Sequence, residues 1–312
     1  MKAPFPWFGG KSRAAGAIWQ RLGDVQNYVE PFAGSLAVLL QRPHEARTET
    51  VNDLDCYLAN FWRAVAHEPE AVAVHADWPC NEADLHARHT WLIGREWFRE
   101  RMKAEPDFYD VKIAGWWVWG QSLWIGSGWC DADCYFDGDQ KLPHLGNAGR
   151  GVHRPSQQLP HLGNAGMGDI YDYFAHLGAR LRRVRVACGD WSRVLGDSVT
   201  FRHGVTGVLL DPPYGHDERQ ADLYANDLDV APAVRDWAIE CGDNPLMRIA
   251  LCGYEDEHEM PASWSAHRWK ARGGYGSQGN GSGRANAARE MIWFSPHCLQ
   301  ERELTLFGTV AD

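Results

Sequence analysis

The residues best suited to chemistry in this chain are four consecutive ones, Asp211, Pro212, Pro213 and Tyr214. They follow the apolar run 208–210, which has the pattern of a short buried strand. Proline fixes φ and lacks a backbone donor, so two prolines must end that strand. The strand end then presents a carboxylate, proline carbonyls and an aromatic ring. These groups are suited to holding an amine on a planar heterocycle, although two prolines are also an ordinary exit from a core strand.

Three earlier segments carry further candidate residues. Residues 6–12 read Pro-Trp-Phe-Gly-Gly-Lys-Ser, but a nucleotide-binding Walker loop would need glycine where Phe5 stands and a strand before it. Residues 28–35 predict a strand and a turn, with an apolar helix starting at Leu36. Asn52-Asp53 ends the next predicted strand.

The positions of these segments favour a nucleotide-like ligand. Doubly wound sheets bind ligands at the carboxyl ends of their strands, beside a helix N-terminus. An acid such as Asp53, about twenty residues after the first turn, commonly holds ribose hydroxyls in these folds.

In this order the motifs resemble those of the D12 class, or Dam-like, N6-adenine-specific DNA methyltransferases. That family has a P-x-x-W-x-G-G-K-like segment, then E-P-F-x-G, an N-D pair, an inserted target-recognition segment and D-P-P-Y. The resemblance covers residues 4–65 and 185–215, and more weakly 289–294. One departure is Leu36, which stands where many members have a second glycine.

The resemblance implies a function and a set of residues for it. It implies transfer of a methyl group from S-adenosylmethionine to the N6 amine of an adenine rotated out of double-stranded DNA, with no metal. The implied catalytic residues are Asp211, Pro212, Pro213 and Tyr214. The implied cofactor-binding residues are Trp7, Gly10, Lys11, Glu30, Phe32, Gly34, Asp53, Asp190, Trp191 and Asp211.

Several of these residues have a structural alternative. Trp7 could be an N-terminal anchor and Lys11 a solvated charge. Asp53 could cap a helix beginning at Leu54, and Asp190 could cap the turn at Ser192, because aspartate favours that position.

The motifs require an α/β fold. Short strand-like segments alternate with helical patterns, which indicates a largely parallel sheet built by right-handed crossovers. With the resemblance, the expected fold is a Rossmann-like S-adenosylmethionine-dependent methyltransferase sheet with helices on both faces. Residues 54–65 predict one such helix, with Leu54, Leu58, Phe61 and Val65 on one face.

The middle of the chain differs in composition. We expect residues 1–75 and 179–312 to form the catalytic domain and 76–178 to be an inserted target-recognition module. The module holds half of the sixteen tryptophans, most of which we expect in a small core. An octapeptide at 142–149 recurs at 159–166 and predicts a duplicated loop. The candidate DNA-binding residues are Arg150, Arg154, Gln157 and Gln158 in this module and Lys270 and Arg272 beyond it.

Composition restricts the class of protein. The 312 residues carry a net charge of −10, which disfavours indiscriminate coating of nucleic acid but allows a local basic groove. No apolar run reaches the roughly 20 residues of a membrane helix, and Met1 to Lys11 lacks the apolar core of a signal peptide. Eight scattered cysteines fit reduced thiols, so we expect a cytoplasmic protein without an obligatory protein partner.

Other functions remain open at this level. The amine could belong to cytosine N4, to an RNA adenine or to a protein glutamine, and the chain could be a catalytically silent DNA-binding relative. A zinc site using Cys130 and Cys134 with His144 or His153 is a weaker alternative, because the cysteine spacing is looser than usual. A compact enzyme of this kind would suit a phage or a restriction-modification system.

Overall fold

The computed structural model describes residues 1–5, 7, 9–124, 129–130, 170–213, 230–269 and 289–300. Its centre is a seven-stranded sheet with the strand order β3-β2-β1-β4-β5-β7-β6. The strands are β1 (Asn27–Glu30), β2 (Thr48–Asp53), β3 (Val184–Cys188), β4 (Thr206–Leu210), β5 (Met247–Tyr254), β6 (Ser265–Arg268) and β7 (Glu290–Phe294).

The pairing of the strands gives the sheet a defined switch point. β1 pairs in parallel with both β2 and β4, β2 pairs in parallel with β3, and β4 with β5. β7 is antiparallel to its neighbours β5 and β6. The chain runs outward from β1 to β3 and then returns to β4, and ligands bind where strand order reverses in this way. The sheet confirms the expected Rossmann-like α/β fold, and β6 is a strand that the sequence patterns did not indicate.

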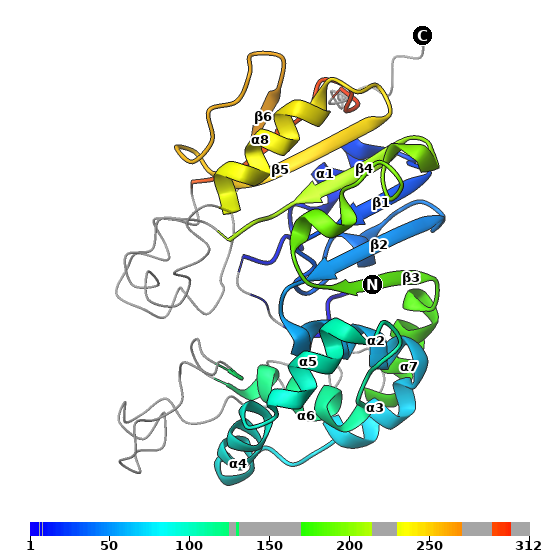
Figure 1. Ribbon diagram of the computed structural model, residues 1–312, viewed down its shortest axis with the longest axis vertical. Helices are drawn as coiled ribbons and strands as arrows, with labels where there is room; N and C mark the ends of the chain where they lie inside the picture. The colour runs from blue at the N-terminus through cyan, green and yellow to red at the C-terminus, as the bar shows by residue number, and fades with distance from the viewer. Residues whose placement is uncertain are drawn as a thin grey trace, which may run out of the picture.

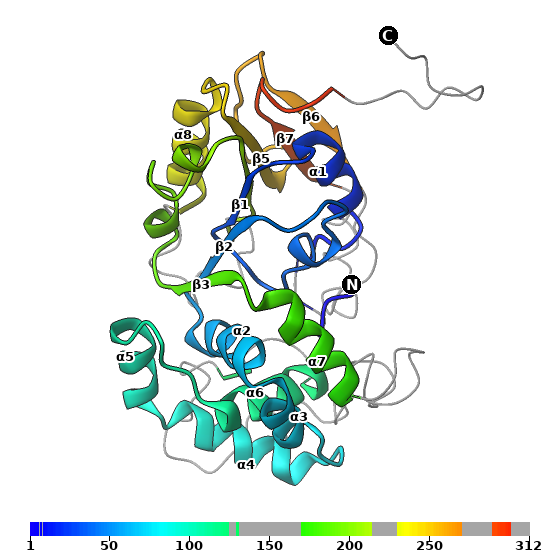
Figure 2. The ribbon, with the colours of Figure 1, turned by 90° about the vertical axis from the view of Figure 1, so that its right-hand side faces the viewer.

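Helices cover both faces of the sheet. α1 (Ala15–Leu22) lies on one face and α8 (Val230–Gly242) on the other (Figure 2). Val208 and Leu210 belong to the same buried cluster as residues of α8, whereas Leu209 belongs to the opposite cluster. This alternation follows from the two-residue period of a strand. Both faces of β4 pack against apolar clusters, so its residues 208–210 are all hydrophobic.

A group of helices lies beyond the β3 edge of the sheet (Figure 1). It comprises α2 (Cys56–His67), α3 (Pro69–Ala76), α4 (Glu82–Ile93), α5 (Glu96–Ala104), α6 (Val111–Leu123) and α7 (Ile170–Leu181). α6 and α7 both pack against α2 and α3. The division of the chain at residues 76 and 178 stays a prediction. Among the helices of the described ranges, none has the length and apolar character needed to cross a lipid bilayer.

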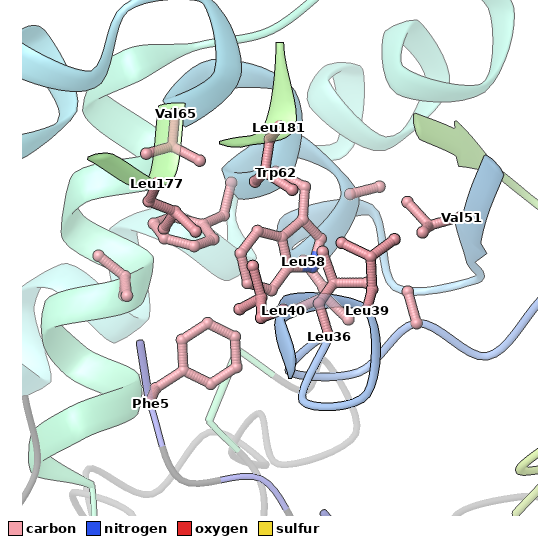
Figure 3. Close-up of a cluster of buried hydrophobic side chains, with 14 of the residues drawn as sticks. Phe5, Leu36, Leu39, Leu40, Val51, Leu58, Trp62, Val65, Leu177 and Leu181 are labelled. Atoms are coloured by element: carbon pink, nitrogen blue, oxygen red, sulfur yellow. The ribbon is translucent and has the colours of Figure 1, made fainter. Parts of the chain in front are cut away.

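The core joins these helices to the sheet. Figure 3 shows Trp62 of α2 surrounded by aliphatic side chains from the segment after β1 and from α7. The cluster includes Phe5, Leu36, Leu39, Leu40, Val51, Leu58, Val65, Leu177 and Leu181. Each fully buried side chain of this size contributes about 1.5–3 kcal/mol.

Six of the eight tryptophans of the middle region are in the core or packed against it, three of them buried and three half-buried. Trp117, Trp119 and Trp124 are buried, whereas Trp78 and Trp97 are exposed. The buried guanidinium carbon of Arg88 lies 5.0, 4.8 and 4.3 Å from the ring centroids of Trp78, Trp116 and Trp119. Burial lowers the pKa of Arg88 to about 10. These contacts to ring faces offset part of the cost of burying the charge.

Two helix predictions need correction. Only the 3-10 helix η1 (Leu39–Gln41) follows the turn after β1, because Leu36 has φ +54°, which a right-handed helix excludes. The helix predicted from Leu54 begins at Cys56 instead. The Asp55 side chain accepts hydrogen bonds from two backbone amides of its first turn, and Leu54 lies outside with 61% of its surface exposed.

Candidate active site

The carboxyl ends of four parallel strands bring the predicted residues to one edge of the sheet. Glu30 ends β1, Asp53 ends β2, Cys188 ends β3, and Asp211 directly follows β4. Adjacent strands are in register near this edge, with Asp53 paired to Cys188 and Val29 paired to Val208. Residues far apart in sequence therefore share one rim.

Asp211 is partly accessible at the rim. Its side chain keeps 22% of its surface exposed, and Pro212 behind it is buried while Pro213 is exposed. The prolines end β4, as predicted. Tyr214 lies outside the described residues.

Lys11 reaches the rim from the N-terminal turn. Its Nζ lies 2.9 Å from Asp211 Oδ1 and 3.8 Å from Glu290 Oε2 on β7, and donates to the Gly9 carbonyl at 2.7 Å. The side chain is 3% exposed, so Lys11 is a buried ion-pair partner and not a solvated charge. Burial by itself lowers the pKa of Lys11, but the Asp211 and Glu290 carboxylates outweigh it and raise that pKa above the ordinary value.

Glu30 is a buried carboxyl beside this ion pair. Tyr28 donates its hydroxyl hydrogen to Glu30 Oε2 at 3.0 Å. Burial raises the pKa of Glu30 to about 8, with a further increase from the negative charge of Asp211, although the Tyr28 hydrogen bond opposes the shift. At neutral pH this carboxyl is mostly protonated.

Asp53 is held between two backbone amides. Its Oδ2 accepts from Gly34 N at 3.0 Å and its Oδ1 from Asp55 N at 2.9 Å. The residue is half-buried by surface area, but desolvation of its carboxyl, followed by the charge of Asp55, raises its pKa to about 7. The alternative role of Asp53 as cap of the following helix is wrong, because Asp55 is the cap of α2.

The first turn after β1 packs directly on the N-terminal segment. Gly34 has φ +46°, and a Cβ at this position would lie 2.8 Å from the Trp7 ring. Gly10 N donates to the Trp7 carbonyl at 3.1 Å. Trp62 Nε1 donates to the Gly34 carbonyl at 3.1 Å. Gly34 is therefore required both for its backbone conformation and for the close approach of Trp7.

Leu36 keeps a glycine-like backbone without being glycine. It has φ +54° and its side chain is fully buried in the cluster of Figure 3. A non-glycine residue in the left-handed region costs roughly 1–2 kcal/mol, which here is offset by burial of the leucine side chain. At this departure from the pattern expected from the sequence, the leucine therefore adopts a backbone conformation that favours glycine.

An aromatic pair lies at the ends of β1 and β3. The rings of Phe32 and Trp191 are stacked, with centroids 6.3 Å apart and an interplanar angle of 24°. Asp190 is exposed, and its Oδ1 accepts from the backbone N and the hydroxyl of Ser192. Asp190 therefore has the capping role considered from the sequence. The two hydrogen bonds to its Oδ1 fix the orientation of the carboxylate, including Oδ2.

Several predicted residues lie outside the described part of the chain. They are Arg150, Arg154, Gln157, Gln158, Lys270, Arg272 and, for the zinc alternative, Cys134, His144 and His153. Within the described ranges, no group of three or more metal-binding side chains occurs.

The structure adds Glu290 and Tyr28 to the site. Tyr28 could have been found from the strand period, because it lies two residues before Glu30 and shares its face. Glu290 carried only the signal of an acid at the start of a short apolar strand. Its role depends on Lys11, which comes from the other end of the chain.

Together these residues form a rim in which one buried ammonium contacts the carboxylates of Asp211 and Glu290, while the carboxyl groups of Glu30 and Asp53 lie at the ends of the neighbouring strands. Such a set suits a cationic ligand, because a nearby positive charge favours the ionised form of Glu30 and Asp53. The exposed edge of Asp211 can accept a hydrogen bond from a second molecule.

Comparison with known proteins relates the first third of the chain, which supplies part of this rim, to one protein family. None of the curated proteins matches the chain. Residues 7–101 match the sequence model of a methyltransferase family, and this range contains Trp7, Lys11, Glu30 and Asp53 but ends before Asp211. The resemblance is therefore confirmed over these residues: residues 7–101 match the model of the D12 class N6 adenine-specific DNA methyltransferases.

Proposed function

We propose that the protein is a site-specific DNA adenine methyltransferase of the cytoplasm. It transfers the methyl group of S-adenosylmethionine to the N6 amine of an adenine flipped out of double-stranded DNA. The observation that carries this proposal is the contact of Lys11 with Asp211, which joins the family-matched segment to the Asp-Pro-Pro strand end.

The rim has the chemistry that the cofactor requires. S-adenosylmethionine supplies an activated methyl group on a positively charged sulfur and carries a ribose diol. Asp211 provides negative charge for the cation, Glu30 would ionise when the cation binds nearby, and Asp53 provides carboxylate oxygens for ribose hydroxyls. The stacked rings of Phe32 and Trp191 offer a flat apolar surface for the adenine moiety. Gly10, Gly34, Trp7 and Asp190 complete the proposed cofactor-binding set.

Asp211 and Pro212 would act on the substrate amine. The lone pair of an exocyclic amine is delocalised into the ring, so the amine is a poor nucleophile. Hydrogen bonds from its two protons to the Asp211 carboxylate and the Pro212 carbonyl would favour a pyramidal nitrogen with its lone pair directed at the methyl group. This is catalysis by orientation and preorganised electrostatics, and Tyr214 would stack on the base.

Lys11 would position Asp211 for this task. The ammonium holds one carboxylate oxygen at 2.9 Å while part of the Asp211 surface stays accessible. A carboxylate fixed on one oxygen loses little further freedom when the other accepts the amine. Methylation leaves the nitrogen with a surplus proton, which the same carboxylate is placed to accept.

The turn at Leu36 supports an active enzyme over a silent relative. The leucine raised that alternative because it replaces a glycine. Its φ of +54° retains the backbone that the glycine would provide, so the turn around Gly34 keeps its amide directed at Asp53.

Recognition of the target site is proposed for residues 76–178. Reading of base edges needs side chains such as Arg150, Arg154, Gln157 and Gln158, and Lys270 and Arg272 would contact phosphates. Aromatic side chains of the module would fill the gap left by the flipped base.

The test is methyl transfer with an isotopically labelled cofactor. Double-stranded DNA, single-stranded DNA and RNA are compared as acceptors, and chromatography of the hydrolysed nucleosides identifies the methylated base. Expected is N6-methyladenine in double-stranded DNA, with the Asp211→Ala variant losing at least roughly 100-fold in rate. Asp236→Ala, at an exposed position on α8, is the matched control. Near-normal turnover by folded Asp211→Ala overturns the role of Asp211, and label in cytosine or RNA redirects the substrate.

A further inference from the structure

Two cysteines meet beside the proposed cofactor site. The Sγ atoms of Cys56 and Cys188 lie 3.6 Å apart, and both residues are buried. Neither is in a disulfide. The proposed methyl transfer uses neither thiol.

The sheet brings these residues together from distant parts of the chain. Cys188 is the last residue of β3 and pairs in register with Asp53 on β2. Cys56 is the first residue of α2, three positions after Asp53. A short turn from one strand therefore returns the chain to the end of its neighbour.

The two thiols are not equivalent. Cys56 lies at the N-terminus of a twelve-residue helix, where backbone amides favour an anion. The hydrogen bond from Cys188 lowers the pKa of Cys56, and Arg99 and Lys103 add to this while burial and Asp55 oppose it. The same hydrogen bond and burial raise the pKa of Cys188. Cys56 is thus the more nucleophilic thiol and Cys188 its neighbour.

We propose that Cys56 and Cys188 form an oxidation site that closes to a disulfide in the presence of a hydroperoxide. The Cys56 sulfur attacks the peroxide, gives Cys56 sulfenic acid and releases water when hydrogen peroxide is the oxidant. The Cys188 sulfur then attacks the sulfenic sulfur, the S–O bond breaks, and a second water leaves. The two thiols lose two electrons and two protons, and the peroxide gains them. The sulfurs must approach from 3.6 Å to roughly 2.05 Å, a small movement.

The disulfide would act on the rim through hydrogen bonds. Gly189 follows Cys188, donates its N–H to the Asp53 carbonyl at 3.0 Å and accepts from Asn52 Nδ2 at 2.9 Å. On the other side, Asp55 precedes Cys56 and donates to Asp53 Oδ1 at 2.9 Å. Movement of either sulfur is therefore transmitted to Asp53. This consequence rests on the proposed function: oxidation weakens the binding of S-adenosylmethionine by at least about 5-fold.

The experiment uses the full chain, reduced and then treated with hydrogen peroxide. After alkylation of free thiols, peptides are analysed by mass spectrometry without reduction. We expect a pair of peptides joined through Cys56 and Cys188, with a mass two hydrogens below the sum of the two reduced peptides. This joined pair should vanish on reduction. Cys188→Ser should stop at a sulfenic acid on Cys56 that a dimedone probe labels. Cys241→Ser, on α8 away from the pair, is the matched control and should still form the link.

The outcomes separate this site from the proposed function. Absence of the Cys56–Cys188 link in the folded wild-type chain, or equal linking of Cys56 to several other cysteines, overturns the oxidation site. Calorimetry with S-adenosylmethionine on reduced and oxidised protein is the second measurement. If the link forms but the reduced protein does not bind the cofactor, the proposed function fails while the oxidation site stands. If both forms bind equally, the coupling to Asp53 is wrong.

Discussion

Lys11 Nζ lies 2.9 Å from Asp211 Oδ1, so a buried ion pair joins the N-terminal turn to the end of β4. Glu290 Oε2 lies 3.8 Å from the same ammonium. Two acids from β4 and β7 therefore depend on one lysine from the start of the chain. Removing one charge of a buried ion pair is strongly destabilising, because the remaining charge loses an interaction that offsets the cost of its burial.

Replacing Lys11 with Met should destabilise the protein strongly. The variant keeps most of the side-chain volume but removes the ammonium that contacts both Asp211 and Glu290. We expect a loss of about 3–5 kcal/mol in the free energy of unfolding, measured by urea denaturation. Adding Glu290→Gln to Lys11→Met should recover part of that loss, because one uncompensated charge is removed. A single-variant loss below about 0.5 kcal/mol would show that the ion pair is not buried as described.

At position 36, the usual order of stability of alanine and glycine variants should be reversed. Both Leu36→Ala and Leu36→Gly lose the buried side chain, at about 2–5 kcal/mol for the truncation. Only glycine relieves the strain of φ +54°, so Leu36→Gly should be more stable than Leu36→Ala by roughly 1 kcal/mol. Thermal and chemical unfolding of the two variants measure this difference.

Leu39 supplies the matched control for that comparison. It is also fully buried in the same cluster, but it belongs to η1 and is not among the residues with positive φ. There, Leu39→Gly should be less stable than Leu39→Ala by about 0.5–1 kcal/mol. The same order at both positions would contradict the strained backbone of Leu36.

Glu30 should make stability depend on pH in a predictable direction. Its pKa rises to about 8 in the folded protein, mainly through burial, so between about pH 5 and pH 8 the folded state holds a proton that the unfolded state has released. The contribution of Glu30 to stability is therefore lost as pH rises through this window. Glu30→Gln removes the titration, so the stability of the variant relative to wild type should increase from pH 5 to pH 8.

Chemical denaturation at several pH values measures this effect. Tyr28→Phe is the control, because it removes the hydrogen bond to Glu30 but keeps the titrating carboxyl. The pH dependence should persist in Tyr28→Phe and shrink in Glu30→Gln. Parallel curves for Glu30→Gln and wild type would mean that Glu30 is already ionised in the folded protein.

Deleting residues 141–168 should change or destroy the preference for a DNA site while sparing cofactor binding. The segment, outside the described residues, has three Lys or Arg and no acid. Sequencing of methylated bases measures preference, and calorimetry measures cofactor binding. The double variant Arg150→Ala, Arg154→Ala is a milder form and should cost about 1–3 kcal/mol per lost base contact. Unchanged site preference after the deletion would place recognition elsewhere.

The sequence by itself determined the class of fold and the residues at the strand ends. Apolar runs that end in Glu30, Asp53 and Asp211 are local signals, since strand burial and strand-breaking prolines follow from residue type and order. β1, β2 and β4 lie where those segments indicated, whereas β6, a half-exposed edge strand, gave no comparable pattern.

The tertiary structure decided which partners these residues have. Whether Lys11 is a solvated charge or an ion-pair partner depends on Asp211 and Glu290, which lie 200 or more positions away in the sequence. The left-handed backbone of Leu36 is set by the turn that Gly34, Trp7 and Asp53 impose, against the helical preference of leucine. The meeting of Cys56 with Cys188 likewise follows from strand register. Local sequence specifies the helices and strands. The contacts and the charge state of each side chain are fixed by long-range packing and desolvation, because they depend on all the residues that surround the side chain and exclude water from it.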